Sequence, residues 1–183
     1  MKREYHVKTA TRNIVYVGMF AAVMAVLSQV SIPMPSGVPI TLQTFAMALT
    51  GVVLGWKMGV LSTLVYILLG AFGVPVFTGF TGGFAKLTGY TGGFIYGFLA
   101  LALFCGIGIC MKNKILGMLL GILGLEICHV CGALQYAFLS GNSFPAAFLL
   151  VSAPYQIKDI ASVVLAFVLG GIIRKQLLRA GLI

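Results

Sequence analysis

The sequence predicts an all-α membrane protein with six transmembrane helices and with both termini in the cytoplasm. Composition, the length of the uncharged stretches and the placement of basic residues each support this prediction. Of the 183 residues, 60% are hydrophobic and 8% are charged, and the mean hydropathy is +1.09. A soluble domain carries about 25% charged residues and about 45–50% apolar ones. Lipid must therefore be the solvent for most of the chain.

Long stretches without a charged residue divide the chain. Because a helix needs about 20 apolar residues to cross the bilayer core, the longest stretches must contain more than one span. Closed barrels also cross lipid, but their strands alternate apolar and polar residues, and these stretches do not. The stretches cover residues 13–56, 58–85, 87–111 and 127–156.

The first predicted span, 13–31, follows a basic N-terminal segment and has the outline of a signal peptide. Its apolar run is longer than a signal h-region and further spans follow it, so we interpret it as a retained helix rather than a cleaved leader. The second span, 41–56, is short, which leaves a tilted or partly re-entrant segment as an alternative. The remaining spans are predicted at 58–73, 92–111, 115–139 and 154–174, and Pro154 suits the first turn of the last one.

The basic residues set the predicted orientation. With both termini inside, ten of the twelve lie at cytoplasmic ends, as the positive-inside rule requires. They are not interleaved with aromatic residues on a polar surface, so we expect anionic lipid headgroups rather than nucleic acid as their counter-charge. The two exceptions are Lys86, in an outer loop, and Lys158, within the last span. The ten are Lys2, Arg3, Lys8, Arg12, Lys57, Lys112, Lys114, Arg174, Lys175 and Arg179.

This orientation places three loops rich in Gly, Pro, Ser and Thr on the outer face, at 31–43, 79–94 and 140–148. The middle one repeats a Thr-Gly-Gly-aromatic unit at 81–84 and 91–94, with Lys86 between the copies. Glycines allow backbone N–H and C=O groups to approach a ligand closely, so we interpret this loop as part of a binding site. A merely flexible connector is the alternative. No phosphate-binding G-x-x-x-x-G-K-[ST] motif occurs.

Asp159 is one of three acidic residues and lies inside the last predicted span. Charged side chains at membrane depth are costly, so a functional role is the default interpretation, with a simple ion pair to Lys158 or Lys86 as the alternative. On a helix, Lys158 and Asp159 both neighbour Ser162, which makes one polar patch below the outer loops. Two opposite charges and a hydroxyl fit a ligand with N–H donors and a carboxylate.

Three further groups of residues each leave two interpretations open. Glu126 and His129, one helical turn apart, could relay protons or form a buried hydrogen-bonded pair. The cysteines include a C-x-x-C pair with His129 between them, which could contribute to a zinc site if other ligands faced it but lacks the histidine position of a c-type haem motif; inside spans we expect all four to pack as small apolar residues. Small residues in the first helix allow close helix approach, either to a partner or within the bundle. The cysteines are Cys105, Cys110, Cys128 and Cys131. The small residues of the first helix are Gly18, Ala21, Ala22 and Ala25.

Four segments, in this order and at these separations, resemble the BioY family, the biotin-specific substrate-binding (S) components of energy-coupling factor (ECF) transporters. The resemblance covers almost the whole chain. The segments are "VPITLQT" (38–44), "LGWKMGVLSTLVYILLGAFGVPVFTG" (54–79), "TGGFAKLTGYTGGFIYGF" (81–98) and "APYQIKDIASVVLA" (153–166).

The resemblance implies a six-helix S-component fold in the cytoplasmic membrane of a prokaryote. Such a subunit captures biotin from outside and is not an enzyme. It binds no cofactor itself, and a transmembrane coupling protein with two ATP-binding cassette ATPases supplies the energy from ATP. In S components the A-x-x-x-A face of the first helix contacts the coupling protein, which implies Ala21 and Ala25, with Gly18 beside them.

The match also assigns site residues. The family's G-P-T-G-G element corresponds to 89–93, with Tyr90 where proline is usual, and Thr81 stands where relatives can carry asparagine. Asp159 fits the family's pattern, but Ser162 stands where a lysine is expected. We therefore take Lys158 as the substitute partner for the biotin carboxylate, and Lys86 as the next candidate.

These assignments predict a complete set of ligand contacts. The ureido N–H groups of biotin would donate to Asp159, and the ureido oxygen would accept from Thr81 or from loop N–H groups at Gly82, Gly83 and Thr91. The ring would pack on Phe80, Tyr90, Phe94 or Tyr155, and Gln43 would add a hydrogen bond.

Two rival functions rest on the same residues. A solitary proton-coupled carrier would use Glu126 and His129. A membrane enzyme would use Cys128, His129 and Cys131, or Glu126.

Overall fold

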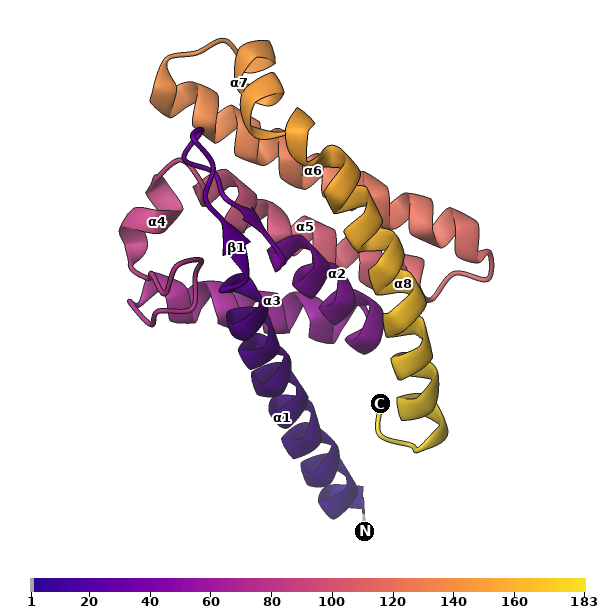
Figure 1. The fold of residues 1–183 in the computed structure, drawn as a ribbon. Helices are drawn as coiled ribbons and strands as arrows, with labels where there is room; N and C mark the ends of the chain where they lie inside the picture. The colour runs from indigo at the N-terminus through magenta and orange to yellow at the C-terminus, as the bar shows by residue number, and fades with distance from the viewer. Residues whose placement is uncertain (1) are drawn as a thin grey trace.

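The computed structural model describes residues 2–183, and the side chains of residues 11–183. The chain is mostly helical, as the sequence predicts (Figure 1). Each predicted span coincides with one helix, although the first helix begins well upstream of residue 13 and the last ends beyond residue 174. These helices are α1 (Lys2–Ser28), α2 (Gln43–Leu54), α3 (Trp56–Ala71), α5 (Gly92–Gly108), α6 (Lys114–Ser140) and α8 (Gln156–Arg179).

Three segments are long and apolar enough to cross a membrane by themselves: Thr11–Ser28, Lys114–Ser140 and Phe144–Arg179. The helices α2, α3 and α5 are apolar but shorter. With 12 residues, α2 is about 18 Å long, against about 30 Å for the hydrocarbon core.

Local sequence signals explain where several helices begin and end. Gly55 alone joins α2 to α3, with a φ of 80° that only glycine adopts readily. The Asn113 side chain accepts hydrogen bonds from the N–H groups of Ile115 and Leu116, so it caps the start of α6. Gly141, in the left-handed region, ends the same helix.

The outer loops contain regular structure that the sequence did not predict. The first folds into a hairpin of β1 (Ser31–Ile32) and β2 (Ile40–Thr41), paired antiparallel. The second contains α4 (Phe84–Thr88), and the third contains α7 (Phe144–Val151). Pro154 lies in the 3₁₀ turn η1 (Ala153–Tyr155) that precedes α8, not in the first turn of α8 itself. These segments are too short to show helical or strand periodicity.

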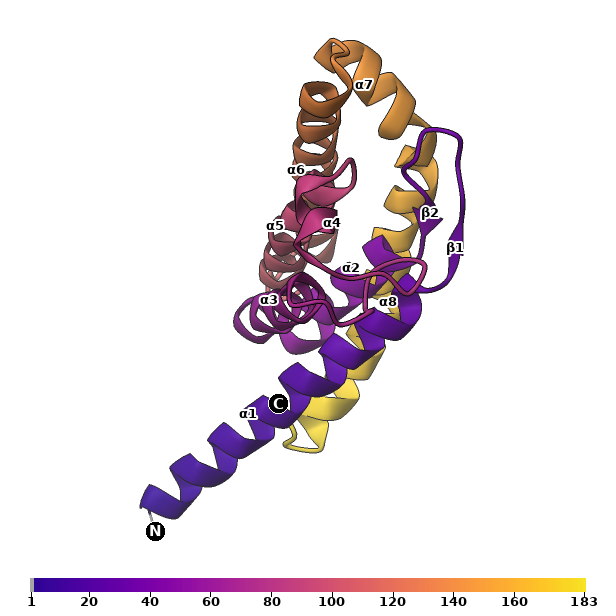
Figure 2. The same ribbon diagram turned by 90° about the vertical axis from the view of Figure 1, so that its left-hand side faces the viewer.

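Both described ends of the chain lie at the same end of the molecule, whereas α7 and the tip of the β-hairpin lie at the other (Figures 1 and 2). Figure 2 also shows α7 leading from the end of α6 across to the start of α8. The buried core joins α1, α2, α3, α5, α6 and α8, and its fully buried side chains include Met24, Met47, Tyr66, Leu101 and Leu125.

Glycines allow α5 and α6 to pack with their backbones in contact. A Cβ added to Gly97 would lie 2.6 Å from the Cα of Cys128, and one added to Gly93 would overlap the carbonyl of Cys131. This close packing places residues of α5 beside residues of α6 at the level of the site described below.

Candidate functional site

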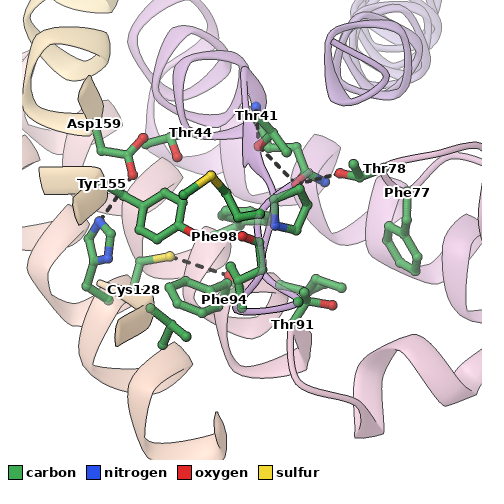
Figure 3. A pocket seen from close by; sticks show the side chains of 18 of the residues that line it. Thr41, Thr44, Phe77, Thr78, Thr91, Phe94, Phe98, Cys128, Tyr155 and Asp159 are labelled. Carbon is green, nitrogen blue, oxygen red and sulfur yellow. Dashed lines mark hydrogen bonds and ion pairs between the residues drawn. The ribbon is translucent and has the colours of Figure 1, made fainter. Parts of the chain in front are cut away.

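A cavity of about 320 Å³ lies beneath the outer loops, where α2, α5, α6 and α8 come together (Figure 3). Eight of the predicted site residues line it, and they come from seven different elements or loops. They are Gln43, Thr81, Lys86, Thr91, Phe94, Tyr155, Lys158 and Asp159.

The wall contains a buried carboxylate, Asp159, which is only 4% exposed. Its carboxylate forms an ion pair with the ammonium group of Lys158. On its other side, the Nε2 atom of His129 lies 3.3 Å from Oδ2 of Asp159. Lys158 also donates a hydrogen bond of 2.8 Å to the carbonyl of Thr41. The Lys158 ion pair that the sequence left as an alternative is therefore present, and it forms part of the cavity wall.

His129 was expected to neighbour Glu126, but the structure pairs these two residues with different partners. Glu126 Oε2 accepts a hydrogen bond of 3.0 Å from the Gln156 side chain, while His129 lies against Asp159. The Nδ1 atom of His129 is buried and has no hydrogen-bond partner among residues 11–183. The contact between α6 and α8 could not be seen from helical spacing, which reports only neighbours on one helix.

Lys86 lies in the last turn of α4 and lines the cavity, and α4 lies across the molecule from α8 (Figures 1 and 2). Among the side chains of residues 11–183, Asp159 forms both of the ion pairs present, with His129 and Lys158. Lys86 therefore presents an ammonium group to the cavity without an acidic partner in that part of the chain.

The amide of Gln43 connects three segments at the edge of the cavity. It donates to the Tyr66 hydroxyl over 2.9 Å and accepts from Thr78 over 3.1 Å and from Thr41 over 3.3 Å. Tyr66 in turn donates to the carbonyl of Val76. Both ends of the Gln43 side chain are thus occupied, so its main role in this structure is to hold the loop after α3 against α2.

The loop between α3 and α4, residues 72–83, is also fastened to the end of α1. We call it the glycine loop. The Gln29 amide donates to the carbonyls of Val76 and Phe77, both over 3.3 Å, and accepts from the Phe80 N–H over 2.8 Å. Ser28 donates to the same Val76 carbonyl over 2.6 Å. The loop is therefore held in place by side chains, and a merely flexible connector does not describe it.

Aromatic side chains form the apolar wall of the cavity (Figure 3). The ring of Phe94 stands edge-on to His129, with 5.9 Å between ring centroids. The Tyr155 hydroxyl donates to the carbonyl of Val38 over 2.6 Å, which fixes the ring beneath the β-hairpin. Phe77 and Phe98 add to this wall, and the sequence analysis had singled out neither. Both belong to ordinary apolar runs, so only the fold distinguishes them.

Five predicted site residues lie outside the cavity wall. Phe80 points outward with 73% of its surface exposed, and its φ of 54° reflects the turn that the Gln29 bond stabilises. Tyr90 stacks on Tyr136, with centroids 5.1 Å apart. Ser162 donates to the backbone carbonyl of Lys158 one turn earlier. The remaining two, Gly82 and Gly83, lie beside the cavity, and Gly83 donates to the carbonyl of Gly70.

Some small residues of α1 face the core of the bundle and others are exposed. Ala21 is 3% exposed and packs in the core, with Ala25 beside it. A partner protein therefore could not reach Ala21 in this conformation, because the A-x-x-x-A pair faces the bundle. The exposed small residues of this helix are Gly18 and Ala22, and the added Cβ of Gly18 meets nothing within 4 Å.

The cysteines are free thiols. Cys105 and Cys128 are buried among apolar side chains, and Cys128 donates weakly to the Phe94 carbonyl over 3.4 Å. No cluster of three or more His, Cys, Asp or Glu side chains suited to a metal ion occurs among the described residues.

The chain is similar to known proteins over most of its length. The sequence model of the BioY family matches residues 1–179. A probable biotin transporter BioY from Pyrococcus horikoshii is 37% identical over 158 residues, which cover 86% of this chain and 93% of the relative. The biotin transporter BioY2 of Lactococcus lactis subsp. cremoris is 34% identical over 164 residues, which cover 88% of this chain and 90% of the relative.

A crystal structure of the S-component for biotin from an ECF-type ABC transporter has the same fold. It superposes with a TM-score of 0.81 at 25% sequence identity and covers 92% of this chain and 93% of the other. The family match and these relatives show that the chain belongs to the BioY family.

Proposed function

We propose that this chain is the substrate-binding subunit of a biotin uptake system and that the cavity beneath the outer loops is its biotin site. The observation that carries the proposal is the division of charge in the cavity wall. One side holds a buried Asp159 with Lys158 and His129, and the other holds Lys86, which has no acidic partner among residues 11–183. Biotin has N–H donors at one end and a carboxylate at the other, with an apolar ring and chain between them.

The volume and lining also suit such a ligand. A volume of about 320 Å³ falls at the lower end of the range for small-molecule sites, about 300–1,000 Å³. Mostly apolar walls with a few placed polar groups are typical of these sites. In our proposed pose the ureido ring lies against Asp159, where its N–H groups donate to the carboxylate. The thioether ring packs on Phe94 and Tyr155.

Lys86 is our proposed partner for the carboxylate. Lys158 is already engaged by Asp159 and by the Thr41 carbonyl, so a second anion there would compete with an existing pair. Lys86 has no such partner among residues 11–183, and binding of the carboxylate would also draw α4 and the glycine loop over the ligand.

We further propose six membrane spans with both termini in the cytoplasm of a prokaryotic cell. The common end of the two described termini and the basic residues concentrated there support this orientation. The short helices α2, α3 and α5 would complete the spans within the bundle, packed against longer neighbours.

Uptake requires partners in this proposal. The structural neighbour is an S-component of an ECF-type ABC transporter, which supports an assembly with a transmembrane coupling protein and two ATPases that use ATP. Gly18 is the exposed residue of the face predicted to meet the coupling protein, and the exposed Ala22 follows it one turn later on α1. Ala21 is excluded from that face by its burial.

The test of the carboxylate assignment compares biotin with biotinamide, which lacks the negative charge. Lys86→Ala should weaken biotin binding roughly 10- to 100-fold, because a charge-assisted hydrogen bond contributes about 1.5–3 kcal/mol. The same variant should leave the affinity for biotinamide nearly unchanged in an equilibrium titration. Lys158→Ala is the comparison, since it disturbs the Asp159 pair and should weaken both ligands. If instead Lys158→Ala selectively loses biotin and Lys86→Ala does not, the assignment is reversed.

The two rival functions receive no support from the geometry. A proton relay from Glu126 to His129 would need the two side chains together, but Glu126 is paired with Gln156 and His129 with Asp159. The family to which the chain belongs consists of transporters rather than enzymes.

A further inference from the structure

We propose that a second cavity, between the start of α6 and the end of α8, binds one anionic phospholipid of the cytoplasmic leaflet. We call it the basic groove. Its volume is about 830 Å³, and it lies at the end of the molecule opposite the outer loops. The inference uses the proposed membrane orientation but does not depend on biotin binding.

The walls of the basic groove are apolar and open to the surroundings. Ile115 of α6 is 68% exposed, and Ile172 and Leu178 of α8 are 58% and 52% exposed. Met118 and Phe167 line its deeper part. The other side of the α8 end is covered, because Leu177 packs on the cluster that includes Tyr16 of α1. The groove therefore faces away from α1, where acyl chains from the bilayer could enter.

Four cations line the basic groove. The Lys114 ammonium donates to the carbonyls of Ile109 and Met111, and Arg174 donates to the carbonyl of Val53. These partners are neutral, and neither side chain forms an ion pair among residues 11–183. The remaining two are Lys175 and Arg179.

Within residues 11–183, Lys175 and Arg179 form no ion pair, since both ion pairs involve Asp159 at the other site. Four positive charges beside an apolar groove match a phosphate attached to two acyl chains. Basic pockets between membrane helices on the cytoplasmic side bind anionic lipid headgroups for this reason. A helix of a partner protein would need acidic residues to satisfy the same four charges, and an anionic lipid provides that charge in every cell membrane.

The experiment is native mass spectrometry of the purified full chain, without biotin, in a neutral detergent with equal amounts of phosphatidylglycerol and phosphatidylcholine of identical acyl chains. The parent should retain one phosphatidylglycerol in preference to phosphatidylcholine. The double variant Lys175→Gln/Arg179→Gln should lose this retention by roughly fivefold for each charge removed. The matched control, Lys57→Gln/Lys112→Gln, removes two cytoplasmic charges outside the groove and should retain the lipid as the parent does.

A second variant tests the apolar part without changing any charge. A Cβ at Gly171 meets only Ile109 Cδ1, at 3.8 Å, so Gly171→Phe can fill the basic groove without a backbone clash. This variant should lose phosphatidylglycerol and keep its unfolding temperature. The matched control is Gly18→Phe on α1, where the added side chain meets open space.

Four results would overturn the proposal. The two lipids could be retained equally, or the control double variant could lose as much lipid as the groove variant. Glycerol phosphate, which has the headgroup charge without acyl chains, could displace the lipid at equal concentration. Finally, the coupling protein could displace the lipid from the parent and fail to bind Lys175→Gln/Arg179→Gln, which would assign the basic groove to that protein.

Discussion

At the residue scale, Asp159 organises the polar half of the site. It is buried on α8, and it brings together Lys158 from its own helix and His129 from α6. A carboxylate this deep in an apolar bundle requires compensating partners, because an unpaired buried charge is costly. The ligand's N–H groups would join an arrangement that is already assembled, so little reordering of these side chains is needed on binding.

Replacing Asp159 by asparagine should therefore weaken biotin binding roughly 10- to 100-fold. The change removes the negative acceptor and leaves Lys158 without its counter-ion, and hydrogen bonds to charged groups contribute about 1.5–3 kcal/mol. Equilibrium titration of the detergent-solubilised protein measures the effect. Glu126→Gln is the matched control, since Glu126 pairs with Gln156 away from the cavity wall. Equal losses in the two variants would show that Asp159 acts on the fold rather than on the ligand.

Much of this residue set could be predicted from the sequence. A charge inside an apolar span and a lysine in an outer loop are both visible without a structure, and so are repeated glycines. His129 was predicted with the wrong neighbour, because its contact with Asp159 joins two helices that lie far apart in sequence. Phe77 and Phe98 were missed because nothing local distinguishes a cavity-facing phenylalanine from a core or lipid-facing one.

At the element scale, side chains from neighbouring segments hold the glycine loop, and Gln29 makes more bonds to its backbone than any other of them. Gln29, at the end of α1, bonds the backbone of Val76, Phe77 and Phe80. The loop carries Thr78 and Thr81 at the cavity wall and leads directly into α4 with Lys86. The order of this loop therefore depends on a residue that does not itself line the cavity.

We expect Gln29→Ala to speed biotin dissociation about tenfold while the association rate changes little. The variant loses several backbone hydrogen bonds, each with a net contribution of about 0.5–1.5 kcal/mol, so the loop opens more often with the ligand bound. A chase of bound biotin with unlabelled ligand gives the rate. Gln176→Ala, on the exposed end of α8, serves as the control. An unchanged dissociation rate in Gln29→Ala would show that the loop does not gate the cavity.

The close packing of α5 against α6 is the second feature of the elements that supports the site. Gly97→Val should lower the free energy of unfolding by about 1–3 kcal/mol, because the new side chain must force the helices apart at Cys128. Gly18→Val makes the same change of residue type on an exposed helix face with open space around it, so it should cost clearly less. Thermal unfolding in detergent compares the two. Equal costs would mean that helix propensity, rather than close packing, explains the loss.

The positions of the long helices could be predicted from hydropathy, whereas the β-hairpin, α4 and α7 could not. Long apolar runs bounded by charged residues predict helices well, because a backbone surrounded by lipid must form its hydrogen bonds within the same segment. The hairpin strands have two residues each, and their pairing of Ser31 with Thr41 depends on contacts with Tyr155 and Lys158 rather than on local propensity. Tertiary contacts therefore determine most of the outer surface.

At the scale of the whole molecule, the two cavities lie at opposite ends of the chain's fold. The outer end holds the proposed biotin cavity beneath three structured loops. The opposite end gathers both termini, most of the basic residues and the basic groove. In the proposed function, biotin would bind at one end of the molecule and the anionic lipid at the other.

The most direct test of the proposed function is an equilibrium titration of the purified chain alone, solubilised in detergent, with biotin. Because the cavity is complete within this one chain, we predict saturable binding of one biotin per chain without ATPases, coupling protein or ATP. The same titration of Asp159→Asn should show a large loss of affinity. A parent protein that is folded by its thermal unfolding curve, yet shows no affinity for biotin, would contradict the proposed function.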